Sequence, residues 1–182
     1  TGKDEWFDRM RAIEDEIWEA PAIGTPYGKI PSQNIEVNGE QIQVLARIYT
    51  MTGEKKYLEW AERLADYYLL PGKFVPSRLR DHGCEIIGGL GLLLGVESEH
   101  NSDKARIYQP LIKEMLDTVL AQGTNEDGIM FNTLGKPNSG LSDGWGYNYV
   151  AYLCYDMVAR KPVYRDRIQQ TLCNLAKPQY AD

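Results

Sequence analysis

The chain has 182 residues, enough for one helical domain with a hydrophobic core, and a formal net charge of −6. An acidic surface repels a phosphate backbone, which argues against nucleic acid as the partner. The longest apolar run, residues 86–96, holds four glycines and is shorter than the roughly 18 residues that a membrane span needs. We therefore expect a soluble protein with no membrane partner. No signal peptide begins at Thr1. The sequence therefore does not indicate a cellular compartment, and export directed by a signal outside this sequence is one of the alternatives.

Three cysteines, an odd number at wide spacing, lack the CxxC pattern of a zinc or redox site. Cys154 and Cys173 lie within apolar helical stretches. We interpret these two and Cys84 as buried inert thiols, and we expect neither a metal nor another cofactor.

Seven segments predict α-helices, because apolar residues recur in them with a period of about 3.6. They cover residues 3–19, 38–52, 54–70, 81–96, 104–122, 145–160 and 162–177. Gly53 is a good stop for the second helix, since glycine reaches the left-handed conformation without strain. Pro162 suits the first position of the last helix, whereas Pro110 is tolerable in the fifth only in or near its first turn.

Two of the long connections carry local signals. Residues 21–37 contain three prolines and two glycines, which predicts an ordered loop that crosses the surface. In residues 123–143 the turn signal Glu126-Asp127-Gly128 precedes residues 129–131, which predicts a small strand or hairpin.

One structural unit occurs three times: a helix that is apolar nearly all round, a short turn and an amphipathic helix with a tyrosine near its start. The units begin near Gly39, Gly83 and Gly146, and the matching tyrosines are Tyr57, Tyr108 and Tyr164. Such repetition predicts stacked helical hairpins, with helices 38–52, 81–96 and 145–160 as the inner ones. The four glycines of helix 81–96 each cost about 1 kcal/mol of helix propensity, and close approach of a neighbouring backbone is the expected compensation.

The connections predict where the functional residues gather. Short turns follow the inner helices and long loops precede them, so an up-down array places every long loop at one end. That end also holds the N-termini of the inner helices, with their unpaired N–H groups and positive dipole ends. Loops on a rigid scaffold are where function concentrates.

Carboxylates, amides, one histidine and several aromatics fall on this rim, which is typical of a carbohydrate site. Acids can serve as general acid and base in glycosidic cleavage, and aromatic faces cover the apolar side of a sugar. Arg78 and Arg80 could hold a sugar carboxylate through a bidentate fork, or pair with a nearby acid. The candidate site residues are Glu40, Gln41, Arg80, Asp81, His82, Glu85, Asp143, Trp145, Tyr147 and Asn148.

Each candidate also has a structural interpretation. Asp81 and Asp143 stand where helix N-caps belong, and Glu85 stands on the side from which a capping-box glutamate approaches. His82 could be a hydrogen-bonded structural group. The aromatic residues of 145–149 could belong to the core.

The segment 38–68, NGEQIQVLARIYTMTGEKKYLEWAERLADYY, resembles a hairpin of the six-hairpin (α/α) toroid enzymes. Asp81-His82-Gly83 and the segment 142–147 before inner helices support this resemblance. The family includes glycoside hydrolases, unsaturated glucuronyl hydrolases, sugar epimerases and some polysaccharide lyases. The resemblance implies an all-α fold of antiparallel hairpins arranged as a partial (α/α) toroid over residues 1–182. It also implies Asp81, His82 and Asp143 as the first catalytic candidates, with sugar contacts at residues 145 and 147.

We therefore expect a carbohydrate-active enzyme domain that binds an oligosaccharide or polysaccharide, including one that contains uronic acid. In a hydrolase Asp81 or Asp143 is the general acid or base. In a lyase His82 or Tyr147 abstracts the proton α to a uronate carboxylate. The alternative is a non-catalytic helical-repeat module that binds protein or glycan.

The resemblance is incomplete, because a closed toroid of this family has about twice as many helices as this sequence predicts. The chain is then a piece of a larger protein, a short divergent array, or one of two copies that assemble. A half ring leaves the flanks of helices 38–52 and 145–160 as exposed apolar surface, which usually marks a partner or a missing domain.

Overall fold

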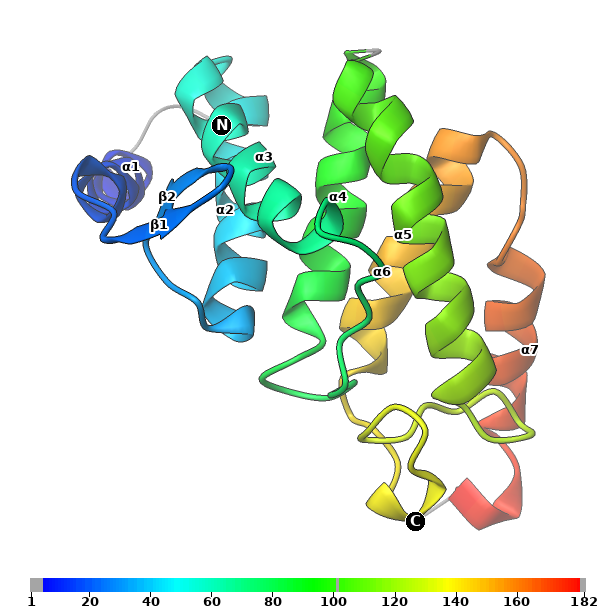
Figure 1. Ribbon diagram of the computed structural model, residues 1–182. Helices are drawn as coiled ribbons and strands as arrows, with labels where there is room; N and C mark the ends of the chain where they lie inside the picture. The colour runs from blue at the N-terminus through cyan, green and yellow to red at the C-terminus, as the bar shows by residue number, and fades with distance from the viewer. Residues whose placement is uncertain (1–4, 101, 181–182) are drawn as a thin grey trace.

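Seven α-helices dominate the computed structural model, which describes residues 5–100 and 102–180 (Figure 1). They are α1 (Glu5–Glu19), α2 (Ile35–Thr52), α3 (Lys55–Leu69), α4 (Glu85–Glu99), α5 (Asp103–Gln122), α6 (Trp145–Ala159) and α7 (Arg165–Asn174). The smaller elements of the described residues are strands β1 (Ile23–Thr25) and β2 (Gly28–Ile30) and the 3-10 turns η1 (Pro137–Ser139) and η2 (Pro178–Tyr180). The predicted all-α class is confirmed. None of the helices described is long and apolar enough to cross a membrane.

The helices stack as hairpins in chain order. The middle inner helix, α4, packs along α2 on one side and α6 on the other, while α3, α5 and α7 each pack against the inner helix that precedes them. In Figure 1, α1 and the β1–β2 hairpin lie at one end of the array and α7 lies at the other. The predicted inner layer of α2, α4 and α6, with α3, α5 and α7 packed against it, is confirmed.

Glycines let the inner helices approach closely. A Cβ atom added to Gly39 would lie 2.4 Å from the backbone nitrogen of Ile86, and one added to Gly91 would lie 2.4 Å from the Cα atom of Ala151. Backbone therefore occupies the space of the missing side chains, as expected for the glycines of α4. Gly95 is the exception among them, because nothing lies within 4 Å of its added Cβ.

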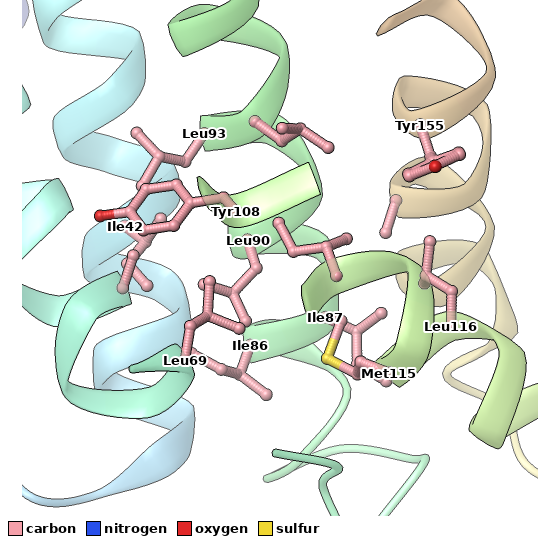
Figure 2. Packing of buried hydrophobic residues seen from close by; sticks show 14 of the residues in the cluster. Ile42, Leu69, Ile86, Ile87, Leu90, Leu93, Tyr108, Met115, Leu116 and Tyr155 are labelled. Carbon is pink, nitrogen blue, oxygen red and sulfur yellow. The ribbon is translucent and has the colours of Figure 1, made fainter. Parts of the chain in front are cut away.

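The core fills the space between the two layers. Figure 2 shows buried side chains from α2, α3, α4, α5 and α6 in one cluster. The three repeated tyrosines are buried in it, and each hydroxyl donates a hydrogen bond to an aspartate. The pairs are Tyr57–Asp15 at 3.0 Å, Tyr108–Asp66 at 2.6 Å and Tyr164–Asp117 at 2.7 Å.

Three of the predicted helix starts are wrong. Helix α7 begins at Arg165, so Pro162 precedes the helix and does not occupy its first position. Helix α2 begins one turn before residue 38, because the Asn34 side chain caps it by accepting hydrogen bonds from the backbone N–H groups of Glu36 and Val37. Helix α4 begins at Glu85 rather than Asp81, because the intervening turn places His82 in the left-handed region at φ 65°. The predicted start of the first helix at residue 3 lies outside the described residues.

The capping interpretation of the two aspartates is also wrong. Cys84 occupies the cap position of α4, and Gly144 occupies that of α6. Neither cap residue supplies a side-chain hydrogen bond, and the carboxylates of Asp81 and Asp143 point elsewhere on the rim. Capping therefore does not account for either aspartate.

Loop and proline predictions need two corrections. Residues 21–37 hold the antiparallel β1–β2 hairpin, with Ile23 opposite Ile30, in addition to loop. Pro110 is the eighth residue of α5 and lies well past its first turn. Its ring is exposed, so the missing N–H falls on the solvent side, while Tyr108 and Ile112 anchor the helix in the core.

The remaining local predictions are confirmed in part. Residues 129–131 form isolated antiparallel bridges, Met130 with Thr124 and Phe131 with Leu141, instead of a full strand. Cys84 is buried as expected, but Cys154 is only partly buried and Cys173 is exposed. Cys173 falls on the outer side of α7, the last outer helix, so a buried-thiol interpretation fails for it.

Candidate functional site

The long connections and the N-termini of the inner helices share one end of the molecule, as predicted. Figure 1 shows the entry to α2, the loop before α4 and the loop before α6 each at the lower end of its inner helix. The loops are tied to one another there. Leu79 N–H donates to the Asn132 carbonyl at 2.9 Å, and the Ser142 hydroxyl donates to the Leu79 carbonyl at 2.7 Å. These hydrogen bonds hold the loops of the rim in fixed positions relative to one another.

A cleft of about 410 Å³ opens on the inner face just above this rim. Helix α2 supplies one wall, α6 supplies the other, and Gly88 of α4 lies between them. The lining residues are Gln43, Arg47, Gly88, Asp143, Trp145, Gly146, Tyr147 and Val150. A Cβ atom on Gly88 would lie 3.3 Å from the Tyr147 carbonyl oxygen, so a larger residue there would crowd the cleft.

Two aromatic side chains face the cleft with exposed rings. Trp145 is 38% exposed and Tyr147 is 48% exposed. The inner side of Trp145 rests on buried Tyr149, with ring centroids 5.7 Å apart and planes at 52°. The core interpretation therefore holds for Tyr149, while the other two rings are available to a ligand.

The opposite wall carries a cation that sequence reasoning missed. Arg47 is exposed, and its Nη1 lies 3.5 Å from the Gln43 side-chain oxygen. Among the described residues, no carboxylate lies within 4 Å of its guanidinium. The sequence did hold a signal, because Arg47 is the only Lys or Arg within the spans of α2, α4 and α6.

Glu36, Glu40, Gln43 and Arg47 form one row along α2, since spacings of four, three and four residues share a helix face. Glu40 is exposed, yet partial desolvation raises the pKa of its carboxyl. The charge of Glu85 raises that pKa further, and the charge of Arg47 opposes the rise. This carboxyl is therefore disposed to carry a proton at a higher pH than an ordinary glutamate.

Glu85 is buried beside this row at the start of α4. Its Oε1 atom accepts a hydrogen bond from the His82 backbone N–H at 3.3 Å and lies 3.5 Å from the Cys84 sulfur. The first contact has the three-residue spacing of a capping box, but Cys84 is the cap of α4 and Glu85 is its first residue, so the capping-box interpretation of Glu85 is wrong. Its Oε2 atom has no hydrogen-bond partner among the described residues.

His82 lies between two acids on the rim. Its Nδ1 is 2.6 Å from Oε2 of Glu36, and its Nε2 is 3.5 Å from Oδ2 of Asp81. The left-handed backbone of His82 is uncommon for a residue with a side chain, and such strain concentrates at functional sites. Glu36 was not a predicted site residue, because the sequence alone does not bring the first turn of α2 against the turn before α4.

Arg80 gathers the two predicted catalytic aspartates. Its guanidinium is hydrogen-bonded to the Asp81 carboxylate and lies 3.9 Å from that of Asp143. The hydrogen bond from Arg80 lowers the pKa of Asp81, so this side chain remains a carboxylate at neutral pH. Asp143 is the more open of the two, with its side chain 73% exposed.

Two predicted binding residues point away from the cleft. The Gln41 side chain accepts a hydrogen bond from Trp18 Nε1 at 2.9 Å and donates to Glu14 at 3.2 Å, so it joins α2 to α1. Asn148 is fully buried, and its Nδ2 donates to the Leu79 carbonyl at 3.0 Å. Both amides are held in contacts within the fold, and neither lines the cleft.

In the part of the chain that the structure describes, no group of three or more His, Cys, Asp or Glu side chains could hold a metal ion. Comparisons with family models, with curated proteins and with solved structures each find no match.

Proposed function

We propose that the chain is a carbohydrate-active domain of the partial (α/α) toroid kind, and that its inner-face cleft binds a glycan containing uronic acid. One observation carries the proposal. Arg47, which has no ion pair within 4 Å among the described residues, faces two exposed aromatic rings across the cleft.

The two walls suit the two sides of an acidic sugar. Trp145 and Tyr147 offer flat apolar faces to the C–H surface of a pyranose ring. Arg47 offers a planar fork that matches a carboxylate through two hydrogen bonds, and Gln43 can exchange hydrogen bonds with hydroxyls. Arg78 and Arg80, the two arginines expected in this role from the sequence, are both paired with Asp81 on the rim.

The acids of the site support proton-transfer chemistry on a glycosidic bond. The pKa of Glu40 is raised by desolvation and by the charge of Glu85, whereas the pKa of Asp81 is lowered by its hydrogen bond from Arg80. Environments that shift the pKa values of two carboxyls in opposite directions are the usual basis of an acid and a base in one site. We assign proton donation to Glu40 and the carboxylate role to Asp81 or Asp143. In an elimination, His82 held by Glu36 is the base, and Tyr147 is the alternative base.

A thermal-shift screen tests the proposal with uronic-acid oligosaccharides and their carboxyl-reduced neutral counterparts. We expect the uronates to raise the Tm of the parent, and we expect Trp145→Ala to abolish that rise. Trp6→Ala is the matched control, because Trp6 is highly exposed on α1 at the end of the array. No rise with any uronate, or an equal rise in Trp145→Ala, would refute the proposed site.

One observation favours the helical-repeat alternative. The inner face is hollowed a second time near the far ends of α4 and α6, where about 430 Å³ opens beside Leu92, Cys154 and Met157. This second hollow combines apolar side chains with Glu99 and Arg160, a mixture that would suit an extended peptide lying along the inner face. Binding of apolar peptides without any response to uronates would favour this alternative.

A further inference from the structure

The last inner helix has an apolar side that nothing in the described structure covers. Val150, Leu153 and Met157 recur on α6 at spacings of three and four residues and are 47%, 41% and 74% exposed. The only charged side chain of α6, Asp156, is buried, where it accepts hydrogen bonds from the N–H groups of Tyr164 and Arg165. This side, called the α6 stripe, presents no charge to solvent.

Two contacts between neighbouring inner helices, α2 with α4 and α4 with α6, have no counterpart among the described residues on the far side of α6, where the α6 stripe lies. On α2, Gly39 receives the backbone of α4, and on α4, Gly91 receives the backbone of α6. Gly146, in the first turn of α6, has nothing within 4 Å of an added Cβ. Each inner helix therefore offers a side to the next, and the side of α6 is unpartnered.

The other end of the array exposes a matching surface. Val37, Val44 and Met51 recur on α2 at intervals of seven residues, which places them in one line along the helix. Val37 and Met51 are exposed and Val44 is partly buried. These three residues are called the α2 stripe, and Figure 1 shows that α2 is the inner helix farthest from α7.

The charges of the outer helices at the two ends are opposite. Helix α1 carries two bases and six acids, of which Glu14 is buried and Asp15 is paired with Lys56. The segment 160–167, which leads into α7, carries four bases and one acid. All four bases of that segment are exposed. Surfaces of opposite potential steer association and fix its orientation.

We propose that copies of this chain associate head to tail, with the α6 stripe of one copy packed on the α2 stripe of a second copy. The bases of 160–167 then face the acids of the second copy's α1. Pairing α6 with α6 would leave the α2 stripe exposed and would bring like charges together. The smallest assembly that covers both stripes of every copy is two copies joined by two such contacts. Gly146 and Val150 also line the cleft, so the second copy would wall its open side.

Sedimentation velocity tests the association across a concentration series up to roughly 100 µM, a range that detects micromolar dissociation constants. We expect a species of twice the 20.7 kDa of one copy. Leu153→Glu is expected to weaken the dimer at least tenfold, whereas Ile107→Glu, at an equally exposed leucine-sized position on α5, is not. Circular dichroism verifies that both variants fold. A parent that stays monomeric throughout, or a Leu153→Glu variant that dimerises like the parent, overturns the proposal.

Cysteine cross-linking tests the orientation in a Cys173→Ser background, which removes the exposed native thiol. One preparation carries Val44→Cys and the other carries Leu153→Cys, since both positions lie in the third turn of their helices. We expect the mixture to form the 44–153 disulfide under mild oxidation. A dominant 153–153 product would show that α6 pairs with α6 and would overturn the head-to-tail arrangement.

Discussion

Two glutamates away from the cleft, Glu97, which is buried, and Glu62, which is partly buried, predict how stability depends on pH. Glu97 of α4 is fully buried, with Oε2 accepting a hydrogen bond from Ser102 and Oε1 lacking a partner among the described residues. Burial raises the pKa of Glu62 from 4.5 to about 7, and the charge of Glu97 adds to the rise, while Lys104 opposes it. Glu62 therefore favours its protonated form in the folded state.

Proton linkage gives the direction in which the free energy of unfolding changes with pH. Between about pH 4.5 and about pH 7 the folded chain binds more protons at Glu62 than the unfolded chain, so stability falls as pH rises through this window. One pKa unit corresponds to about 1.4 kcal/mol, which sets an upper limit of about 3 kcal/mol for the loss above pH 7. Because Glu62 is only partly buried and solvent screens it, we expect a loss of about 1–2 kcal/mol.

The substitution Glu62→Gln keeps the shape of the side chain and removes its charge. We expect the variant to match the parent near pH 5 and to exceed its free energy of unfolding by about 1–2 kcal/mol at about pH 8. Urea unfolding followed by circular dichroism measures both, with the m-value checked for constancy. Glu59→Gln, at an exposed position of the same helix, is the control. An equal pH slope in Glu62→Gln and parent would refute the reasoning.

Three further predictions concern packing, capping and thiol reactivity. Gly91→Ala should lower the free energy of unfolding by about 1–3 kcal/mol, because its Cβ would meet the α6 backbone. Gly95→Ala, whose Cβ would enter open space, should be neutral or stabilising. Chemical denaturation of both variants and the parent measures the difference. Asn34→Ala should cost about 1 kcal/mol through the lost cap of α2, measured as a shift in Tm against Asn34→Asp, which retains the cap. A thiol reagent should modify Cys173 fastest in the native protein, and should spare Cys84, whose pKa burial raises to about 12; rapid native labelling of Cys84 would contradict this.

The sequence was informative about the helices because their periodicity and stops are local. Gly53 ends α2 in the left-handed conformation, at φ 73°, as its type predicts. The start of α2 was misplaced because Asn34 and Asn38 both resemble caps, and only the structure shows that Asn38 is buried and donates to Tyr68 at 2.9 Å. Helix ends with competing polar residues need tertiary context.

The candidate site was predicted at the level of the rim but less well for single side chains. The direction of Gln41 depends on where α1 packs, and that of Asn148 depends on the loop that carries Leu79. Glu36 meets His82 only through the fold. Arg47 was within reach of sequence reasoning, since a lone cation on an apolar inner helix requires a reason to be there.

The central claim is that Arg47 recognises the carboxylate of an acidic sugar, and calorimetry tests it most directly. The ligands are a uronic-acid oligosaccharide that shifts the parent's Tm and its carboxyl-reduced counterpart. Each is titrated into the parent, into Arg47→Gln and into the control variant Arg9→Gln, which changes an exposed arginine of α1. Loss of a charged bidentate partner costs about 1.5–3 kcal/mol, or roughly ten- to a hundredfold in Kd. The account predicts that loss for the uronate in Arg47→Gln alone, with the reduced sugar binding all three proteins equally weakly. Uronate binding that survives Arg47→Gln unchanged would contradict it.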